Sequence, residues 1–346
     1  MDTPWGELAY EYLPVAIDRR SQVLHPFAIP CMQGVLALNV TRGCSHACVY
    51  CYARAYPEAP PRGQLMVYEN LPARLEAELA RMRRLPRAVS LCTATDPFQP
   101  FPSLLAVTYQ AAEMLLSRGI TVTFLTKGYI PDEFVALFAR SPELVRARIG
   151  LLSLDPGYHR TFEPGAAPPE VRLENLRRLR AAGIAAGVRH DPVIPGVTDK
   201  PEALDRLFAA LRKEGITSVD VGYLYIRPGI AQLLRDELPP EVSRPLLHQF
   251  RRGPIEEVAA SQHTKLLPPD IRVRSFFKIQ QAAREHGILP ILCRCKNPDM
   301  KADRCQGSRD LAYPTPPRRA RQLALALDPA QVVCTIITGK GGTPCP

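Results

Sequence analysis

Residues 35–52 read VLALNVTRGCSHACVYCY, and they join a short apolar run to a loop that carries three cysteines. The apolar run at 35–40 predicts a buried β-strand. Cys44, Cys48 and Cys51 follow it with the spacing C-x3-C-x2-C. The loop therefore leaves the C-terminal end of the first predicted strand, the end at which parallel α/β proteins bind their ligands.

The three cysteines point to metal or redox chemistry, because clustered thiols in a reducing compartment rarely form a disulfide framework. A [4Fe–4S] cluster normally takes four thiolates, so three on one loop would bind three irons and leave the fourth open to a substrate or cofactor. The alternatives are incidental thiols and a structural zinc site with Cys31 or His46 as a fourth ligand. Zinc sites typically combine two paired knuckles, and no second pair lies close by in the sequence.

Between about 35 and 240, short apolar runs alternate with amphipathic helices in six consecutive units. The predicted strands are 35–40, 88–92, 121–126, 149–154, 185–189 and 218–226, and the predicted helices are 71–84, 103–118, 132–139, 170–182 and 201–214. This order predicts an α/β fold with a parallel sheet and right-handed crossovers, as an open doubly wound sheet or a partial barrel. In both cases, side chains at the C-terminal ends of the strands face the ligand site.

The sequence predicts three segments. Residues 1–34 look irregular and would wrap the domain, residues 35–240 form the α/β domain, and residues 241–346 form a C-terminal extension. In the extension we expect one helix at 275–286, followed by a short apolar run at 288–292 that leads into further cysteines. The extension is therefore a candidate for a second metal site.

The cysteine loop, with Tyr50 directly before the third cysteine, resembles the signature of the radical S-adenosylmethionine (SAM) superfamily. That resemblance implies a partial (β/α)6 barrel of the TIM type, in agreement with the six units counted above. It also implies a [4Fe–4S] cluster whose open iron chelates SAM, and an electron donor such as flavodoxin or ferredoxin as a partner. One electron would cleave SAM to a 5′-deoxyadenosyl radical that abstracts hydrogen from the substrate, while the protein positions and shields the reacting groups.

Four further segments narrow the resemblance, which covers roughly residues 35–240. Residues 95–100, 125–127, 162–168 and 192–199 are similar to the spore photoproduct lyase-like, or DNA repair photolyase-like, group of that superfamily. The resemblance places the SAM amino group at the second strand end, the SAM carboxylate or ribose at the third and fourth, and the adenine near the backbone of the cysteine loop. The residues implied are Thr93, Thr95, Asp96, Lys127, Ser153, Tyr50 and Tyr52.

Three of these residues have simpler interpretations. Lys127 is otherwise a surface lysine, and Ser153 is otherwise a strand-end hydroxyl that bonds to its own backbone. Asp96 would equally serve as a turn residue or helix cap before Pro97. We nevertheless expect SAM contacts from Lys127 and Ser153.

Cys92 also matches a position in the group. In spore photoproduct lyase a cysteine near this strand end returns a hydrogen atom to the product radical, so the resemblance makes Cys92 a catalytic candidate. Here it precedes Asp96 by one residue more than the group's pattern leads us to expect. The alternative is that Cys92 is simply a small buried apolar residue on a strand.

A second set of cysteines follows the predicted extension helix. Cys293, Cys295 and Cys305 have the spacing C-x-C-x9-C and would bind an auxiliary iron–sulfur cluster or zinc. A fourth ligand would come from elsewhere in the chain, the candidates being Cys31, Cys334 and Cys345. This pattern departs from spore photoproduct lyase, and the alternative is surface thiols on a turn.

The chain is basic, with 44 Lys and Arg against 34 Asp and Glu and a formal net charge of +10. Such a surface favours a polyanionic partner, DNA or RNA, although arginines on solvated helix faces give the same charge. Polar and aromatic side chains are expected to face the substrate from the ends of the fifth and sixth strands, namely His190, Asp191, Tyr223, Tyr225 and Arg227.

Targeting signals are not visible. No apolar run approaches the length of a bilayer span, and residues 1–10 lack a basic patch followed by an apolar stretch. We therefore expect a cytoplasmic protein without a membrane segment. The leading hypothesis is a radical SAM enzyme that repairs or modifies a nucleic-acid base. The alternatives are a radical SAM enzyme for a small metabolite or peptide with an auxiliary cluster, and a non-catalytic, metal-dependent nucleic-acid-binding protein.

Overall fold

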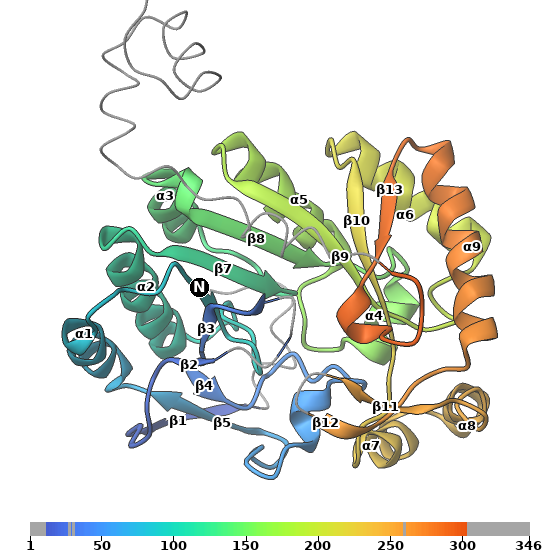
Figure 1. The fold of residues 1–346 in the computed structure, drawn as a ribbon, viewed down its shortest axis with the longest axis horizontal. Coiled ribbons are helices and arrows are strands. Elements are labelled where there is room, and N and C mark those ends of the chain that lie inside the picture. The colour runs from blue at the N-terminus through green and yellow to red at the C-terminus, as the bar shows by residue number, and fades with distance from the viewer. Residues whose placement is uncertain (1–11, 27–28, 30–31, 259–260, 303–346) are drawn as a thin grey trace, which may run out of the picture. The chain divides into compact units, whose positions relative to one another are not determined.

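The computed structural model describes residues 12–26, 29, 32–258 and 261–302. Its main feature is a curved sheet of eight strands in the order β13-β10-β9-β8-β7-β6-β3-β2 (Figure 1). In chain order the strands are β2 (His25–Pro26), β3 (Val35–Leu38), β6 (Ala88–Leu91), β7 (Thr121–Thr126), β8 (Val145–Gly150), β9 (Ala185–Val193), β10 (Ser218–Tyr223) and β13 (Leu289–Leu292). Seven are parallel to their neighbours, and β2 alone pairs antiparallel, with β3.

The strands from β3 to β13 follow one another in both sequence and space, as in a barrel wall. The two edges, β2 and β13, are not paired with each other in the described part of the chain, so no closed barrel forms. The predicted α/β fold with a parallel sheet is confirmed, and the partial barrel describes it better than a doubly wound sheet. A doubly wound sheet would reverse its strand order in the middle.

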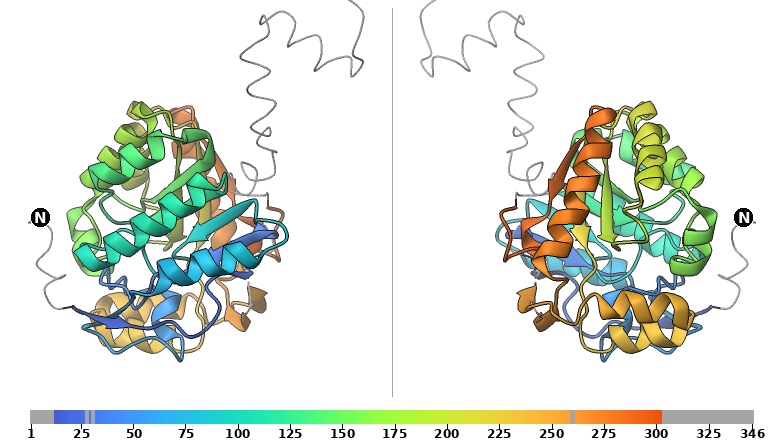
Figure 2. Two further views of the ribbon diagram at one scale, coloured as in Figure 1. Left: turned by 90° about the vertical axis from the view of Figure 1, so that its left-hand side faces the viewer. Right: turned by 90° about the vertical axis from the view of Figure 1, so that its right-hand side faces the viewer.

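Helices cover the outer face of the curved sheet (Figures 1 and 2). They are α1 (Leu71–Arg81), α2 (Pro102–Ser117), α3 (Asp132–Ala139), α5 (Pro169–Ala181), α6 (Pro201–Lys213) and α9 (Pro269–Glu285). Proline occupies the first turn of five of them, where its missing N–H costs no hydrogen bond. Left-handed glycines such as Gly119 and Gly183 follow the helix ends, as the sequence predicted.

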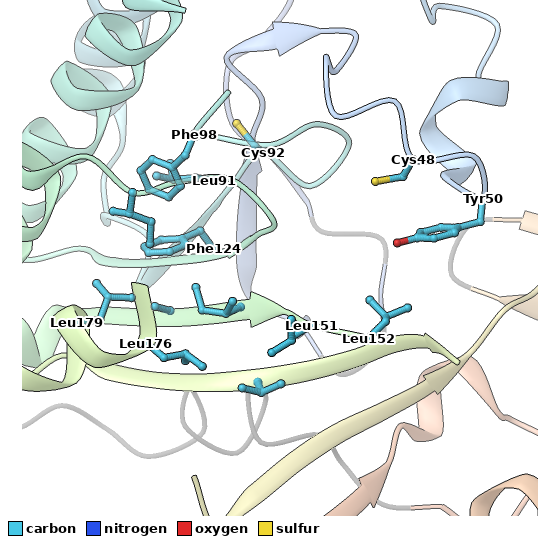
Figure 3. Packing of buried hydrophobic residues seen from close by; sticks show 14 of the residues in the cluster. Cys48, Tyr50, Leu91, Cys92, Phe98, Phe124, Leu151, Leu152, Leu176 and Leu179 are labelled. Atoms are coloured by element: carbon cyan, nitrogen blue, oxygen red, sulfur yellow. The ribbon is translucent and has the colours of Figure 1, made fainter. Parts of the chain in front are cut away.

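The hydrophobic core lies between the sheet and these helices (Figure 3). Phe98 and Phe124 pack edge to face with ring centroids 5.1 Å apart, and Leu176 and Leu179 of α5 are fully buried. Each such side chain contributes about 1.5–3 kcal/mol when it leaves water. The same cluster includes Cys48, so the core continues into the cysteine loop.

Smaller elements complete the fold. A three-stranded sheet has the order β1 (Leu13–Ile17), β5 (Gln64–Tyr68) and β4 (Thr41–Arg42), and β11 (Ile255–Val258) pairs with β12 (Ser261–Lys265) as a hairpin. The remaining elements are α4 (Pro156–Phe162), α7 (Ile230–Glu237), α8 (Pro240–His248) and the short 3-10 helices η3 (Tyr52–Ala55), η4 (Pro142–Leu144) and η5 (Arg294–Lys296). Within the described ranges, no helix is both long and apolar enough to cross a membrane.

Three expectations need correction. The strand expected at 149–154 is β8, which runs from Val145 to Gly150, because Arg146 and Arg148 hide its first half from an apolar pattern. The N-terminal segment is not irregular throughout, since β1 and β2 are strands. The extension after residue 240 supplies β13, a seventh parallel strand beside β10. The division into three segments itself stays a prediction.

Candidate active site

The cysteine loop begins just beyond β3 and β4, at the C-terminal mouth of the sheet. Gly43 has φ +85°, and a side chain there would come within 2.8 Å of the Pro60 ring and 2.9 Å of the Gln64 carbonyl oxygen. Only glycine fits this position without strain. The loop is therefore fixed at its start against the segment that leads into β5.

The end of α4 and the segment that follows it hold the other side of the loop. The Val49 N–H donates to the Phe162 carbonyl at 3.1 Å, and the Gly165 N–H donates to the His46 carbonyl at 3.0 Å. A Cβ atom on Gly165 would lie only 2.1 Å from the Ser45 carbonyl oxygen. Two backbone segments separated by more than a hundred residues thus touch directly.

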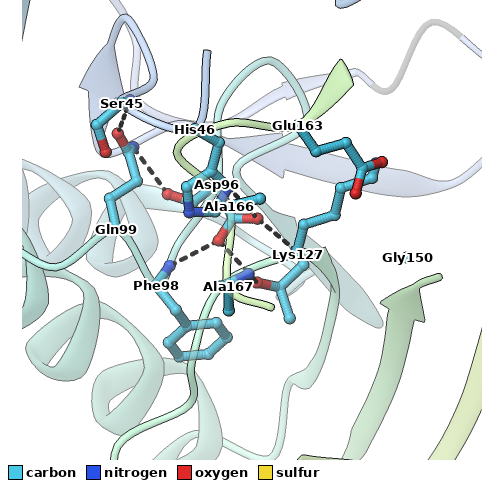
Figure 4. A network of polar contacts seen from close by, with 12 residues as sticks. Ser45, His46, Asp96, Phe98, Gln99, Lys127, Gly150, Glu163, Ala166 and Ala167 are labelled. Carbon is cyan, nitrogen blue, oxygen red and sulfur yellow. Dashed lines mark hydrogen bonds and ion pairs between the residues drawn. The ribbon is translucent and has the colours of Figure 1, made fainter. Parts of the chain in front are cut away.

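Gln99 ties the loop to the end of the second parallel strand (Figure 4). Its Oε1 accepts the Ser45 N–H at 2.7 Å, and its Nε2 donates to the Asp96 carbonyl at 3.0 Å. The side chain is completely buried. A buried amide that satisfies backbone groups on both sides fixes the loop at a defined distance from that strand end.

The three thiols are enclosed rather than free in solvent. Cys48 is buried, whereas Cys44 and Cys51 are partly exposed. Burial raises the pKa of Cys48 to about 12, with an opposing effect from the Lys127 ammonium. Burial, Asp96 and the other two thiols raise the pKa of Cys44 well above its usual value. Thiolates in this loop therefore need a positive partner, and a bound metal supplies one.

The donor set fits an iron–sulfur cluster better than zinc. Thiolates are soft ligands that suit both. Within the described ranges, however, no three His, Cys, Asp or Glu side chains surround one point as a single metal ion requires. In a cluster the thiolates bind different iron atoms and need not converge. Of the proposed fourth zinc ligands, His46 contacts Asp96, with 3.4 Å between Nδ1 and Oδ2, and Cys31 lies outside the described residues.

The Asp96 carboxylate accepts several hydrogen bonds from the protein itself. Its Oδ1 accepts from the Phe98 N–H at 2.9 Å and the Thr126 hydroxyl at 2.7 Å, and its Oδ2 accepts from the Lys127 N–H at 2.9 Å (Figure 4). Together with His46, these contacts occupy both oxygens of the buried carboxylate. The interpretation of Asp96 as a turn residue is therefore supported, and its role in binding SAM stays a prediction.

Thr93 and Thr95 lie on the same strand end. The Thr93 carbonyl accepts a hydrogen bond from the Tyr52 hydroxyl at 3.0 Å, which holds the ring next to the cysteine loop. Thr95 Oγ1 is buried beside the Cys92 thiol, and its hydrogen bond to that thiol acts against the effect of burial on the pKa of Cys92. The role of Thr95 in binding SAM stays a prediction.

The Lys127 side chain runs from the end of β7 toward Glu163 (Figure 4). Its ammonium lies 5.6 Å from the centroid of the Tyr50 ring. Among the described residues it forms neither a hydrogen bond nor an ion pair. It lies close enough to Cys48 and Glu163 to act against the effect of burial on the pKa of both groups. Lys127 is therefore a cation in the mouth that is able to receive an anionic ligand.

A buried network that sequence reasoning missed supports the Tyr50 ring. The Tyr50 hydroxyl donates to Glu163 Oε1, and Arg172 Nη1 pairs with Glu163 Oε2 at 2.5 Å. Arg172 also donates to the carbonyls of Ala167 at 2.6 Å and Gly150 at 3.0 Å. Burial raises the pKa of Glu163, but Arg172, Lys127 and Tyr50 outweigh it, so the carboxylate stays ionised.

The positions of Ser153 and Cys92 give less support to the roles that the resemblance implies for them. Ser153 Oγ accepts from the Asp155 N–H at 3.1 Å, which is the strand-end role considered above. Cys92 is buried with φ +54°, and burial raises the pKa of its thiol to about 12. In Figure 3 its sulfur points away from Cys48 and Tyr50. The SAM contact of Ser153 and the catalytic role of Cys92 stay predictions.

A cluster of aromatic and cationic side chains joins the end of the cysteine loop to the segment after β10. The Tyr52 and Tyr225 rings stack with centroids 6.3 Å apart, and the Arg227 guanidinium lies 4.7 Å and 5.5 Å from them. Arg227 also donates to the Tyr56 hydroxyl at 2.9 Å. Of the other strand-end residues expected to face substrate, His190 and Tyr223 are buried and bond to backbone carbonyls.

Asp191 joins this cluster to the C-terminal cysteines. It accepts from Lys296 Nζ at 2.6 Å and from Arg189 Nε at 2.7 Å, and Arg189 also contacts Cys293 Sγ at 3.6 Å. Cys293 is buried and Cys295 is partly exposed. Cys305 lies outside the described residues, as do Cys334 and Cys345. Lys296 was missed because its partner is 105 residues away.

Comparison with known proteins identifies the family. The profile of the Radical SAM superfamily matches residues 38–222, more than half of the chain. The chain belongs to this superfamily. Membership implies a [4Fe–4S] cluster and SAM as cofactors, and it makes the chain an enzyme. The alternative of a non-catalytic nucleic-acid-binding protein is therefore wrong.

Two relatives show how far the similarity extends along the chain. An uncharacterised protein of Mycobacterium tuberculosis (strain H37Rv) is 33% identical over 229 residues, which cover 63% of this chain and 67% of that protein. A radical SAM Nα-GlyT isomerase of Pseudomonas phage M6 is 23% identical over 273 residues, which cover 77% of this chain and 55% of the isomerase.

Solved structures show the same fold. A mutant of spore photoproduct lyase matches with a TM-score of 0.65 and 16% identity, over 85% of this chain and 86% of the lyase. A second mutant, with AdoMet and dinucleoside spore photoproduct bound, matches with a TM-score of 0.64 and 15% identity, over 84% and 85% of the two chains. The spore photoproduct lyase-like architecture therefore extends well beyond the matched superfamily segment.

Proposed function

We propose that Cys44, Cys48 and Cys51 hold the [4Fe–4S] cluster and that the enzyme repairs or modifies a nucleic-acid base. When bound, the cluster and SAM supply a 5′-deoxyadenosyl radical that abstracts hydrogen. The observation that carries the proposal is the placement of Lys127. Its ammonium has no ion pair among the described residues and lies beside the cysteine loop, where a ligand carboxylate would neutralise it.

The chain's own residues have positioning roles in this proposal. Lys127 attracts the SAM carboxylate to the side of the mouth where its ammonium lies beside Tyr50. Gln99 keeps the cysteine loop at the strand end, and Glu163 keeps the Tyr50 ring against it. Fixed partners of this kind align the reacting groups before the reaction begins.

The substrate class rests on charge and on the relatives. The chain carries a net charge of +10, and Arg227 and Lys296 place two cations at the mouth of the sheet beside tyrosine rings. Guanidinium and aromatic groups suit nucleobases and phosphates. The structurally similar spore photoproduct lyase binds a dinucleoside photoproduct, which supports a nucleic-acid base as substrate here.

The first test concerns the cluster and SAM. After anaerobic reconstitution of the full chain, Cys44→Ala, Cys48→Ala and Cys51→Ala should each lose iron and stop forming 5′-deoxyadenosine. Cys92→Ala is the matched thiol control, and it should keep its iron. Normal iron content and SAM cleavage in all three loop variants would refute the proposed ligands.

The second test concerns the substrate. Short single- and double-stranded DNA and RNA should bind with an affinity that falls steeply between about 50 and 200 mM salt, because lysine and arginine contacts to phosphates release counterions. If SAM is cleaved but no nucleic acid binds at low salt, the nucleic-acid proposal fails and a small metabolite or a peptide becomes the substrate class to test.

A second metal centre is a separate proposal. Cys293, Cys295 and Cys305 would hold an auxiliary cluster or zinc, supported by the position of Cys293 and Cys295 beside the mouth. Iron and zinc should be measured in the wild type and in the triple alanine variant. About eight irons in the wild type and about four in the variant would support a second [4Fe–4S] cluster. About four irons and no zinc in both would refute a second metal.

A further inference from the structure

On three neighbouring strands of the main sheet, a charged residue on one strand lies opposite a glycine on the next. Lys127, Arg148 and Asp191 lie on or just beyond β7, β8 and β9, and each faces a glycine of the next strand. Arg148 pairs in register with Gly187, and Lys127 follows the pair of Thr126 with Ile149, which places it opposite Gly150. Asp191 lies beside Gly222 in the same way. The pattern occurs at three successive strand pairs.

Each glycine leaves room for the charged side chain opposite. A Cβ atom on Gly150 would lie 2.9 Å from Lys127 Cγ, 3.1 Å from Cε and 3.2 Å from Nζ. One on Gly222 would lie 2.8 Å from Asp191 Cγ, and one on Gly187 would lie 3.3 Å from Arg148 Nη1. Ordinary contacts between carbon atoms are about 3.5–4.0 Å, so at Gly150 the lysine would have to move along most of its length.

Backbone conformation does not explain these glycines. None of the three is among the glycines with positive φ in the described part of the chain. Alanine would therefore be allowed at each position if the facing side chain were absent. What glycine provides here is space above the strand.

We infer that Gly150 is a positioning residue, which lets the Lys127 side chain lie across β8 so that its ammonium stays beside Tyr50 and the cysteine loop. This inference rests on the proposed function, in which that ammonium binds the carboxylate of SAM. Gly150 also anchors the neighbouring network, because its carbonyl accepts from Arg172 Nη1 at 3.0 Å. A side chain at Gly150 would leave this backbone hydrogen bond possible but displace Lys127.

The test compares Gly150→Ala with Lys127→Ala by two readouts, the dependence of 5′-deoxyadenosine formation on SAM concentration and the Kd of SAM measured by equilibrium dialysis without a reductant, and both should move together. Loss of one charged contact should raise KM for SAM about tenfold or more in each variant, with a smaller change in kcat. In the double variant KM should match that of Lys127→Ala alone, because Gly150 acts only through the lysine. Gly187→Ala is the matched control on the next strand, where the methyl group meets only the flexible end of Arg148.

The outcomes separate this inference from the proposed function. A normal KM in Gly150→Ala, or a further rise when that change is added to Lys127→Ala, overturns the inference. A normal KM in Lys127→Ala refutes the proposed role of Lys127 instead. If Gly150→Ala folds poorly, its melting temperature should recover in the Lys127→Ala background, since the clashing side chain is gone. Failure to recover also overturns the inference.

Discussion

The buried ion pair between Glu163 and Arg172 allows the loss of folding stability in a Glu163 variant to be predicted. Glu163→Gln removes the negative charge but keeps the shape of the side chain and its ability to accept the Tyr50 hydroxyl. Both partners are 1% exposed, and Arg172 Nη2 already lacks a hydrogen-bond partner among the described residues. Breaking such a pair leaves an uncompensated buried charge and typically costs about 3–5 kcal/mol. We expect the free energy of unfolding to fall by about that amount.

The matched variants show whether charge is the cause. Replacing both partners, as Glu163→Gln with Arg172→Met, should cost less than the single change because no buried charge remains. Glu174→Gln breaks a contact to Arg177 on the solvent-exposed face of α5, and it should cost about 0.5 kcal/mol or less.

Urea unfolding of the metal-free chain, followed by circular dichroism under anaerobic conditions, measures these differences through the transition midpoint and slope. A loss of under about 1 kcal/mol in Glu163→Gln would refute the reasoning, because it would mean that the guanidinium finds another partner or water. A double variant that is less stable than the single variant would also contradict it.

Two further changes test the loop and an acid-sensitive contact. Gly165→Ala should lower iron loading, because its Cβ would lie 2.1 Å from the Ser45 carbonyl oxygen in the cysteine loop. Gly253→Ala is the control, because its Cβ would clash in the same way, at 1.7 Å from the Leu266 carbonyl oxygen. It should destabilise the fold but leave the iron content per folded chain unchanged. Burial raises the pKa of Asp299, but Arg272 outweighs it and lowers that pKa below its usual value. The contact therefore stabilises the fold above about pH 4 and is lost as pH falls through the lowered pKa. Asp299→Asn should be about 2 kcal/mol less stable than wild type at pH 6 by urea unfolding, and this difference should shrink progressively as the pH falls below about 4.

Local pattern was sufficient for much of the architecture. The helix at Asp132–Ala139 was predicted with its observed bounds, and five of the six expected strands overlap the observed ones over most of their length. The exception is β8, which contains Arg146 and Arg148. Their charge breaks the apolar run, and only pairing with β7 and β9 shows that the segment is a strand.

The site residues show the same difference between what local sequence predicts and what it does not. Spacing alone singled out Cys44, Cys48 and Cys51, since ligands on one loop are close in space whatever the rest of the chain does. Contacts between distant segments were not predictable in this way. Glu163 meets Tyr50 across 113 residues, and Lys296 meets Asp191 across 105 residues. Such pairs depend on strand order and register, which a pattern of neighbouring residues does not contain.

The sequence by itself determined the α/β class, the cysteine loop at the first strand end and the resemblance to radical SAM enzymes. The tertiary structure alone decided that Asp96 bonds mainly to the protein, that Lys127 lies across a glycine without an ion pair among the described residues, and that β13 extends the sheet. The physical reason is the distance along the chain over which each kind of interaction acts. Apolar periodicity and ligand spacing act over a few residues, whereas burial, charge pairing and steric fit depend on which strands lie side by side.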